Sequence, residues 1–149
     1  MGESIDLFKI TKDILELPDR DIHSYPPLVL AYIGDAVYEL IVRTATVVNT
    51  EAAVDKLNKK TTSYVKAQAQ AAVVRLLNDE LSEDEKSVYR RGRNAKTYST
   101  AKNASKGDYH AATGFEALIG YLYLTGETKR LEELIKEGLR RYNEELQSQ

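Results

Sequence analysis

Residues 28–42, LVLAYIGDAVYELIV, decide how this sequence folds. Apolar residues occupy nearly every side of the helix that they would form, which predicts a helix buried within a helical domain. Asp35 lies near the middle of this stretch. A buried carboxylate without a partner is costly, or it takes up a proton. The stretch therefore predicts that Asp35 has a partner elsewhere in the chain.

A second apolar stretch, residues 113–124 (TGFEALIGYLYL), also contains one charged residue, Glu116. The two isolated acids share an explanation if the two helices meet and a cation lies between the carboxylates. Gly34 and Gly120 support such a meeting, because a glycine inside a helix costs about 1 kcal/mol relative to alanine. That cost is understandable if another backbone approaches each glycine closely.

A hard divalent cation such as Mg²⁺ binds carboxylate and water oxygens, so Asp35 and Glu116 are the candidate metal ligands. The alternative is that each acid pairs with a buried Lys or Arg, such as Arg43. Glu39 lies four residues after Asp35 on the same helical face and could be a further ligand. We favour an ion pair between Glu39 and Arg43, which lies another four residues along the chain.

The composition limits the class of protein. The chain has 149 residues, of which 42% are hydrophobic and 30% charged, and this predicts one soluble domain over residues 1–149. There is no cysteine, which excludes disulfides and thiolate metal sites. The first residues lack a secretory-signal pattern, and no uncharged run is long enough to span a membrane. We expect a cytoplasmic protein without a membrane partner.

The periodicity of apolar residues predicts an all-α fold, because strand-type alternation is scarce. Ser82 and Glu85 have the spacing of a capping box, and Gly126 is placed to end a helix. The expected helices are one or two within 5–18, then 26–47, 50–60, 65–76, 83–92, 109–124 and 131–142, with a loop over 93–108.

A basic segment contrasts with the net charge of −2. Residues 86–107 contain seven Lys and Arg residues and no acid, which is more than the end of a helix needs. Phosphate contact explains the excess better, because Lys and Arg neutralise phosphates whatever the base sequence. The predicted contact residues are Arg90, Arg91, Arg93, Asn94, Lys96, Lys102 and Lys106.

Three motifs resemble a known family. Residues 31–40 (AYIGDAVYEL) resemble the signature helix of the ribonuclease III catalytic domain, and residues 115–124 (FEALIGYLYL) resemble its second acidic helix. Residues 91–96 (RGRNAK) are similar to the Mini-III branch. The resemblance implies a ribonuclease III endonuclease-domain helical bundle, a homodimer, and Mg²⁺-dependent hydrolysis of double-stranded RNA to 5′-phosphate and 3′-hydroxyl ends. In it, Asp35 matches the catalytic aspartate and Glu116 the metal-binding glutamate.

The sequence also departs from full-length members of that family. Ala31 and Thr113 stand where those members have acids, so we expect weaker metal binding. No double-stranded-RNA-binding domain is seen, so the basic segment would hold the RNA. The resemblance suggests precursor 23S ribosomal RNA as the substrate. Two alternatives are a non-catalytic protein of the same fold that binds structured RNA, and a helical metal-dependent nucleotide hydrolase, which would need more clustered acids or histidines.

Overall fold

The computed structural model describes residues 7–96 and 105–149, and these residues contain helices and no strand. This confirms the predicted all-α class. The α-helices are α1 (Leu7–Leu15), α2 (Pro27–Asn49), α3 (Val54–Val65), α4 (Ala67–Leu76), α5 (Glu83–Asn94), α6 (Lys106–Leu124) and α7 (Thr128–Gln147). Two 3₁₀ turns, η1 (Ile22–Ser24) and η2 (Asn78–Glu80), precede α2 and α5. None of the described helices is long and apolar enough to cross a membrane.

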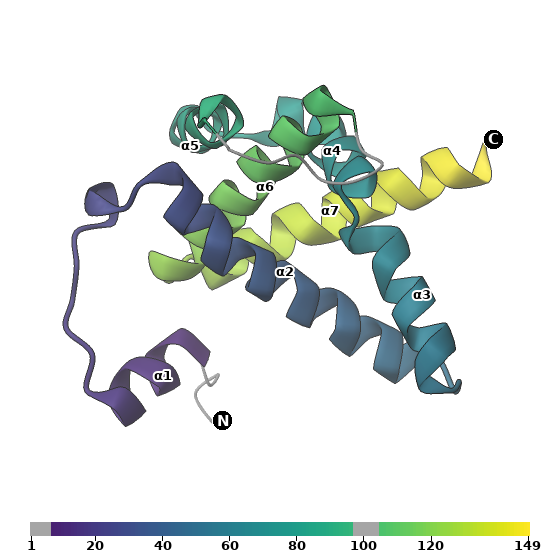
Figure 1. Ribbon diagram of the computed structural model, residues 1–149, viewed down its shortest axis with the longest axis horizontal. Coiled ribbons are helices and arrows are strands. Elements are labelled where there is room, and N and C mark those ends of the chain that lie inside the picture. Colours follow the sequence, from purple (N-terminus) through teal and green to yellow (C-terminus); the bar gives the residue numbers. More distant parts are fainter. Residues whose placement is uncertain (1–6, 97–104) are drawn as a thin grey trace.

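Helix α6 is the centre of the bundle, and it packs against α2, α4, α5 and α7 (Figure 1). Its side chains Phe115, Leu118 and Ile119 are fully buried. Phe115 meets Tyr38 of α2 edge to face, with the two ring centroids 5.2 Å apart. A helix surrounded in this way must be apolar on nearly all sides, which explains why residues 113–124 carry so little charge.

Helices α2 and α6 cross at two glycines, as the sequence predicts. A Cβ atom added at Gly34 would lie 1.8 Å from the main-chain oxygen of Glu116, and one added at Gly120 would lie 2.0 Å from the main-chain oxygen of Leu30. Neither position has room for any side chain. The close approach of the two backbones is thus confirmed, and it sets Asp35, the residue after Gly34, beside the turn of α6 that carries Glu116.

Helix α2 is not buried all round, which corrects the expectation for residues 28–42. Tyr32 is 81% exposed, and Leu28, Val29 and Leu40 are also largely exposed. Asp35 lies on the exposed side as well. Helix α2 therefore has two apolar faces. One packs against α6, and the other is exposed to solvent in the single chain.

Several helix ends follow from local hydrogen bonds. Ser82 and Glu85 form the predicted capping box, and Gly126 has a φ of 73°, as the predicted helix end requires. Helix α5 continues past Gly92 because that glycine packs against Ala117 and Gly114 of α6. Helix α6 begins at Lys106, because the Ser105 hydroxyl accepts a hydrogen bond from the amide of Asp108. Residues 93, 94 and 106–108 of the predicted loop over 93–108 are thus helical, and residues 97–104 of it lie outside the described residues.

Helix α3 differs from its predicted extent at both ends. It begins at Val54 rather than at residue 50, and α2 runs on to Asn49. It also continues through residues 61–63 to Val65. The hydroxyls of Thr62 and Ser63 donate to carbonyls one turn back in the same helix, so they do not interrupt it.

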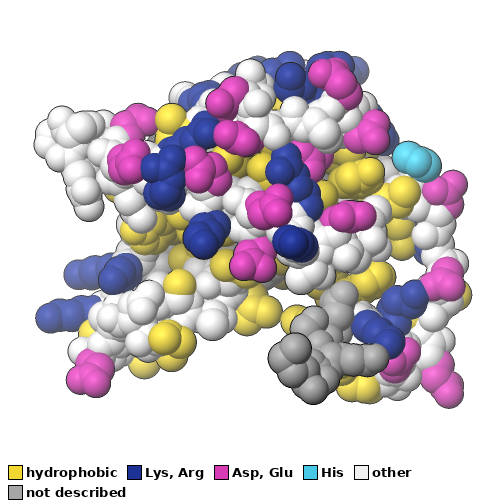
Figure 2. Space-filling view, turned by 180° about the vertical axis from the view of Figure 1, so that it is seen from behind, with side chains coloured by type: hydrophobic (Ala, Val, Ile, Leu, Met, Phe, Trp, Pro, Cys, Tyr) yellow, Lys and Arg dark blue, Asp and Glu magenta, His cyan; other side chains and the backbone are white. Residues whose placement is uncertain are grey.

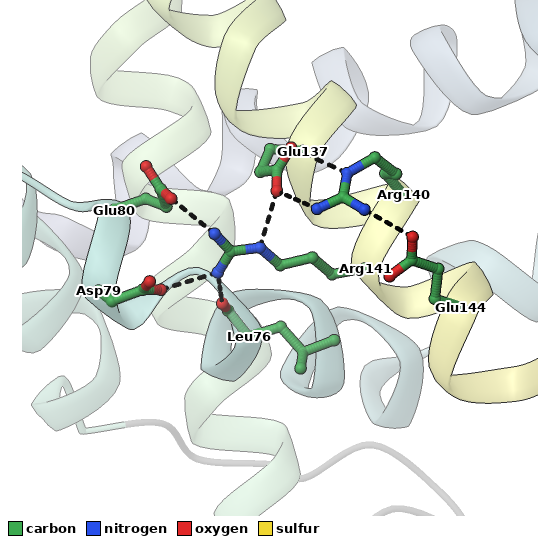
Figure 3. Close-up of polar contacts among 7 residues, drawn as sticks. All are labelled: Leu76, Asp79, Glu80, Glu137, Arg140, Arg141 and Glu144. Carbon is green, nitrogen blue, oxygen red and sulfur yellow. Dashed lines mark hydrogen bonds and ion pairs between the residues drawn. The ribbon is translucent and has the colours of Figure 1, made fainter. Parts of the chain in front are cut away.

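Two arginines fasten α7 to the rest of the bundle. Arg141 donates to the main-chain oxygen of Leu76 at 2.6 Å and also contacts the carboxylates of Asp79 and Glu80 (Figure 3). Nearer the start of α7, Arg130 binds both carboxylate oxygens of the buried Glu85 at 2.8 Å. This pairing holds the pKa of Glu85 below its usual range. Acidic and basic side chains alternate over the middle of the face in Figure 2.

Candidate active site

Asp35 of α2 and Glu116 of α6 line the same pocket, which has a volume of about 200 Å³. The two residues are 81 positions apart in the sequence. Helix α4 and the turn between α3 and α4 close the pocket on the other side. The remaining lining residues are Val65, Ala67, Gln70, Tyr109, Ala112 and Thr113. The structure therefore brings the two predicted site acids together, as the sequence analysis expects.

The two carboxyl groups have different surroundings. Asp35 is exposed to solvent, whereas Glu116 is half-buried. Burial, together with the neighbouring Asp35 carboxyl, raises the pKa of Glu116 to about 9. At neutral pH in the absence of a cation, Glu116 thus keeps its proton, because two adjacent negative charges in a partly buried place repel each other. A cation bound between them would remove this repulsion.

The alternative in which each acid pairs with its own Arg or Lys is not found. Neither Asp35 nor Glu116 forms an ion pair within residues 7–96 and 105–149. Arg43 instead lies 3.3 Å from Glu39, which confirms the favoured pairing of those two residues. Glu39 does not line the pocket.

The chemistry of the pocket fits a hard divalent cation. Its oxygen donors are the two carboxylates and the side-chain oxygen of Gln70, which has no hydrogen-bond partner within the described part of the chain. No cluster of three or more Asp, Glu or His side chains occurs among those same residues. Asp35 and Glu116 would thus hold an ion that keeps several waters, as Mg²⁺ does.

Three of the predicted phosphate-contact residues line two hollows outside the acidic pocket. Arg93 and Asn94 line a wide hollow of about 610 Å³ between the end of α5, α4 and the start of α6. Arg91 lines a smaller hollow beside His23 and the start of α2. Arg90, Lys96 and Lys106 are exposed, and Lys102 lies outside the described residues. Lys and Arg side chains gather along the upper edge of Figure 2, where Figure 1 places α4 and α5.

Sequence reasoning missed Gln70 and Tyr109 as lining residues of the acidic pocket. A signal for Gln70 was present, because it occupies a core position of α4 next to the buried Ala69, Val73 and Val74. A polar residue at such a position usually has a specific partner. Tyr109 gave no comparable signal. His110 lines the wide hollow and not the acidic pocket.

Comparison with known proteins agrees with this geometry. The Ribonuclease III domain family matches residues 28–127. The Mini-ribonuclease 3 of Clostridium tetani is 49% identical, over 90% of this chain and 89% of the relative. That of Thermoanaerobacter sp. is 50% identical, over 80% of this chain and 84% of the relative. A crystal structure of a Fusobacterium nucleatum protein has a TM-score of 0.73 at 29% identity, covering 82% of this chain and 98% of that one.

The helical bundle and the facing acids on α2 and α6 therefore belong to a phosphodiester hydrolase, and the chain is a member of the ribonuclease III domain family. Within that family it groups with the Mini-ribonuclease 3 proteins. It is an endoribonuclease that acts on double-stranded RNA, and enzymes of this family depend on a metal ion and leave 5′-phosphate and 3′-hydroxyl ends. This assignment favours the nuclease over the RNA-binding and nucleotide-hydrolase alternatives.

Proposed function

We propose that the protein is a homodimeric, Mg²⁺-dependent endoribonuclease of the cytoplasm that matures precursor 23S ribosomal RNA. Asp35 and Glu116 are the catalytic and metal-binding residues. The observation that carries this proposal is the shared pocket of two carboxyl groups, in which no Lys or Arg of the described part of the chain is a lining residue. The ribosomal substrate rests on the resemblance to the Mini-III branch and not on the pocket.

The residues of the pocket have separate tasks in this proposal. Asp35 and Glu116 would hold the Mg²⁺, which when bound would supply hydroxide from water at neutral pH and would stabilise the charge that develops on the phosphate. Asp35 is exposed, so a phosphate of an RNA duplex can reach it from solvent. Glu116 gives up its proton when the cation binds. Thr113, which stands where full-length members have an acid, donates its hydroxyl to the Tyr109 carbonyl at 3.0 Å and adds no charge.

The nuclease is tested directly with a base-paired RNA that contains a 23S precursor stem. With Mg²⁺ we expect cleavage of both strands, and the products should carry 5′-phosphates. Adding a chelator should stop the reaction, and a single-stranded RNA of the same sequence should stay intact. If the duplex is bound but remains uncut across a range of Mg²⁺ concentrations, the protein is a non-catalytic RNA-binding member of the fold. The absence of acids at Ala31 and Thr113 would agree with that result.

The basic segment is proposed to bind phosphates and 2′-hydroxyls of the duplex, with A-form shape as the main recognition signal. Arg93→Gln should weaken duplex binding and reduce the slope of log affinity against log salt by about 1, because one phosphate contact is lost. Fluorescence anisotropy without divalent ions measures this slope. Arg140→Gln is the matched control, since that arginine is paired with Glu137 and Glu144 on α7. Equal slopes for both variants would remove Arg93 from the RNA interface.

The exposed side of α2 is proposed as the dimer interface. Leu28, Tyr32, Ala36 and Leu40 recur every four residues and so lie along one helical face. All four are exposed in the single chain. An exposed apolar strip of this kind is typical of a protein–protein interface. Asp35 lies beside the strip, so two copies joined there would place both acidic pockets near the dimer axis.

Tyr32→Glu should convert the dimer to a monomer at micromolar concentrations, because it places a charge in the middle of the apolar strip. Sedimentation velocity measures the change. Leu146→Glu serves as the control, because that leucine is also exposed but lies at the end of α7. A Tyr32→Glu variant that stays dimeric would show that the interface lies elsewhere.

A further inference from the structure

Gln70 is the buried polar side chain of α4, with only 3% of its surface exposed. Its Nε2 donates a hydrogen bond to the main-chain oxygen of Val65 at 2.7 Å. Its Oε1 is buried and has no hydrogen-bond partner among residues 7–96 and 105–149. A buried acceptor left without a partner is destabilising, and native structures contain few of them. This oxygen therefore calls for an explanation.

The orientation of the Gln70 amide follows from its bond to Val65. A main-chain carbonyl can only accept, so the amide nitrogen must face Val65, and the oxygen must point elsewhere. Turning the amide over would set two acceptors against each other. Val65 is the last residue of α3, so the bond also fixes the amide at the junction of α3 and α4. The unpartnered oxygen thus belongs to a rigid group.

The surroundings of Gln70 limit what this oxygen can bind. Gln70 lines the acidic pocket together with Asp35 and Glu116. The Gln70 and Glu116 side chains lie within hydrogen-bonding reach, so a protonated Glu116 can partner Gln70 while no cation is bound. Once a cation is bound, both acids are ionised and neither has a proton to donate, so Oε1 then needs another donor. A water molecule attached to a divalent cation is a strong donor, and Mg²⁺ keeps several such waters in sites with few protein ligands. A neutral acceptor also suits a pocket in which Thr113 provides no carboxylate.

We propose that Gln70 is a positioning residue of the metal site, and that its Oε1 accepts a hydrogen bond from a water bound to the cation that Asp35 and Glu116 hold. The inference rests on the proposed function, because it requires a cation in the acidic pocket. Gln70 orients the water and does not contact the reacting phosphate. Residues that support a metal site from outside its direct ligands raise its affinity for the ion.

The test replaces Gln70 by methionine, which has a similar length but neither an acceptor oxygen nor an amide donor. Mn²⁺ stands in for Mg²⁺, and the free ion is counted by electron paramagnetic resonance in a titration of the full chain. We expect Gln70→Met to bind Mn²⁺ about tenfold more weakly. The Mg²⁺ concentration that gives half-maximal cleavage should rise by a similar factor, while the rate at saturating Mg²⁺ changes little.

Gln68→Met is the matched control, because Gln68 lies on the same helix but does not line the acidic pocket. It should bind Mn²⁺ like the unsubstituted protein. If Gln70→Met also binds Mn²⁺ normally and only lowers the melting temperature, Gln70 is merely structural and the proposal is overturned. The bond to Val65 that Gln70→Met removes would account for such a result.

Two further measurements separate this inference from the proposed function. If Asp35→Asn binds Mn²⁺ as well as the unsubstituted protein, the metal site itself is wrong. If Asp35→Asn loses the ion while Gln70→Met keeps it, only the role of Gln70 fails. Should Gln70→Met not fold, crystals of the unsubstituted protein with Mn²⁺ decide: an ion-bound water within about 3.2 Å of Oε1 supports the proposal, and an oxygen without one refutes it.

Discussion

Asp35→Asn is expected to lower the rate of duplex RNA cleavage by about 10³-fold or more while the dimer stays intact. The substitution keeps the size of the side chain but removes one of the two negative charges that would hold the cation. Stabilisation of the transition state by a bound metal is worth several kcal/mol, and each 1.36 kcal/mol corresponds to about tenfold in rate. Single-turnover cleavage of an end-labelled duplex at saturating enzyme measures the loss. Glu116→Gln should have an effect of the same order.

Glu39→Gln is the control for Asp35→Asn. Glu39 lies one helical turn from Asp35 and also carries a carboxylate, but that group is paired with Arg43 and lies outside the acidic pocket. The control variant should keep most of its activity. Undiminished cleavage by Asp35→Asn would remove Asp35 from the mechanism, and equal losses in both variants would indicate a general effect of charge on RNA binding.

Gly34→Ala should destabilise the protein by about 3 kcal/mol or more, because the added methyl group would overlap the main chain of α6. The nearest atom, the Glu116 carbonyl oxygen at 1.8 Å, is backbone and cannot turn aside as a side chain would. In a chain of this length the loss corresponds to a fall in melting temperature of roughly 10 °C. Calorimetry or circular dichroism at matched protein concentration measures it.

Gly107→Ala provides the comparison, since a methyl group there would meet only the end of the Arg75 side chain at 3.9 Å. Within the first turn of α6, alanine should be neutral or slightly stabilising. If Gly34→Ala has the same melting temperature as Gly107→Ala, α2 and α6 can separate at little cost in free energy. The close crossing would then not be what sets the spacing of the two acids.

The sequence predicted most of the architecture, because the features that decide it are local or repeated. The lack of strand-type alternation, the capping box at Ser82, and the glycines at positions 34 and 120 all indicate their roles without coordinates. The proximity of Asp35 and Glu116 could also be predicted from the sequence. Two isolated charges on two apolar helices have few explanations other than contact with each other.

What the sequence could not predict depends on which neighbour covers which face. Asp35 was expected to be buried, but α6 covers only one side of α2, and composition cannot tell a face packed within the chain from a face left open. Helix α5 was expected to end at Gly92, but that glycine is required by the packing of Ala117. The place of Gln70 depends on the turn between α3 and α4, which leaves no pattern in the sequence.

The close packing of Gly34 against the peptide group of Glu116 has a consequence for how this protein can adapt to heat or cold. The crossing of α2 and α6 also sets the distance between Asp35 and Glu116. A substitution that weakens this crossing would therefore also change the active site. Changes in flexibility must therefore accumulate at the periphery, in α1, α3 or the far end of α7. A warm-adapted and a cold-adapted version of this chain would be expected to share this crossing unchanged.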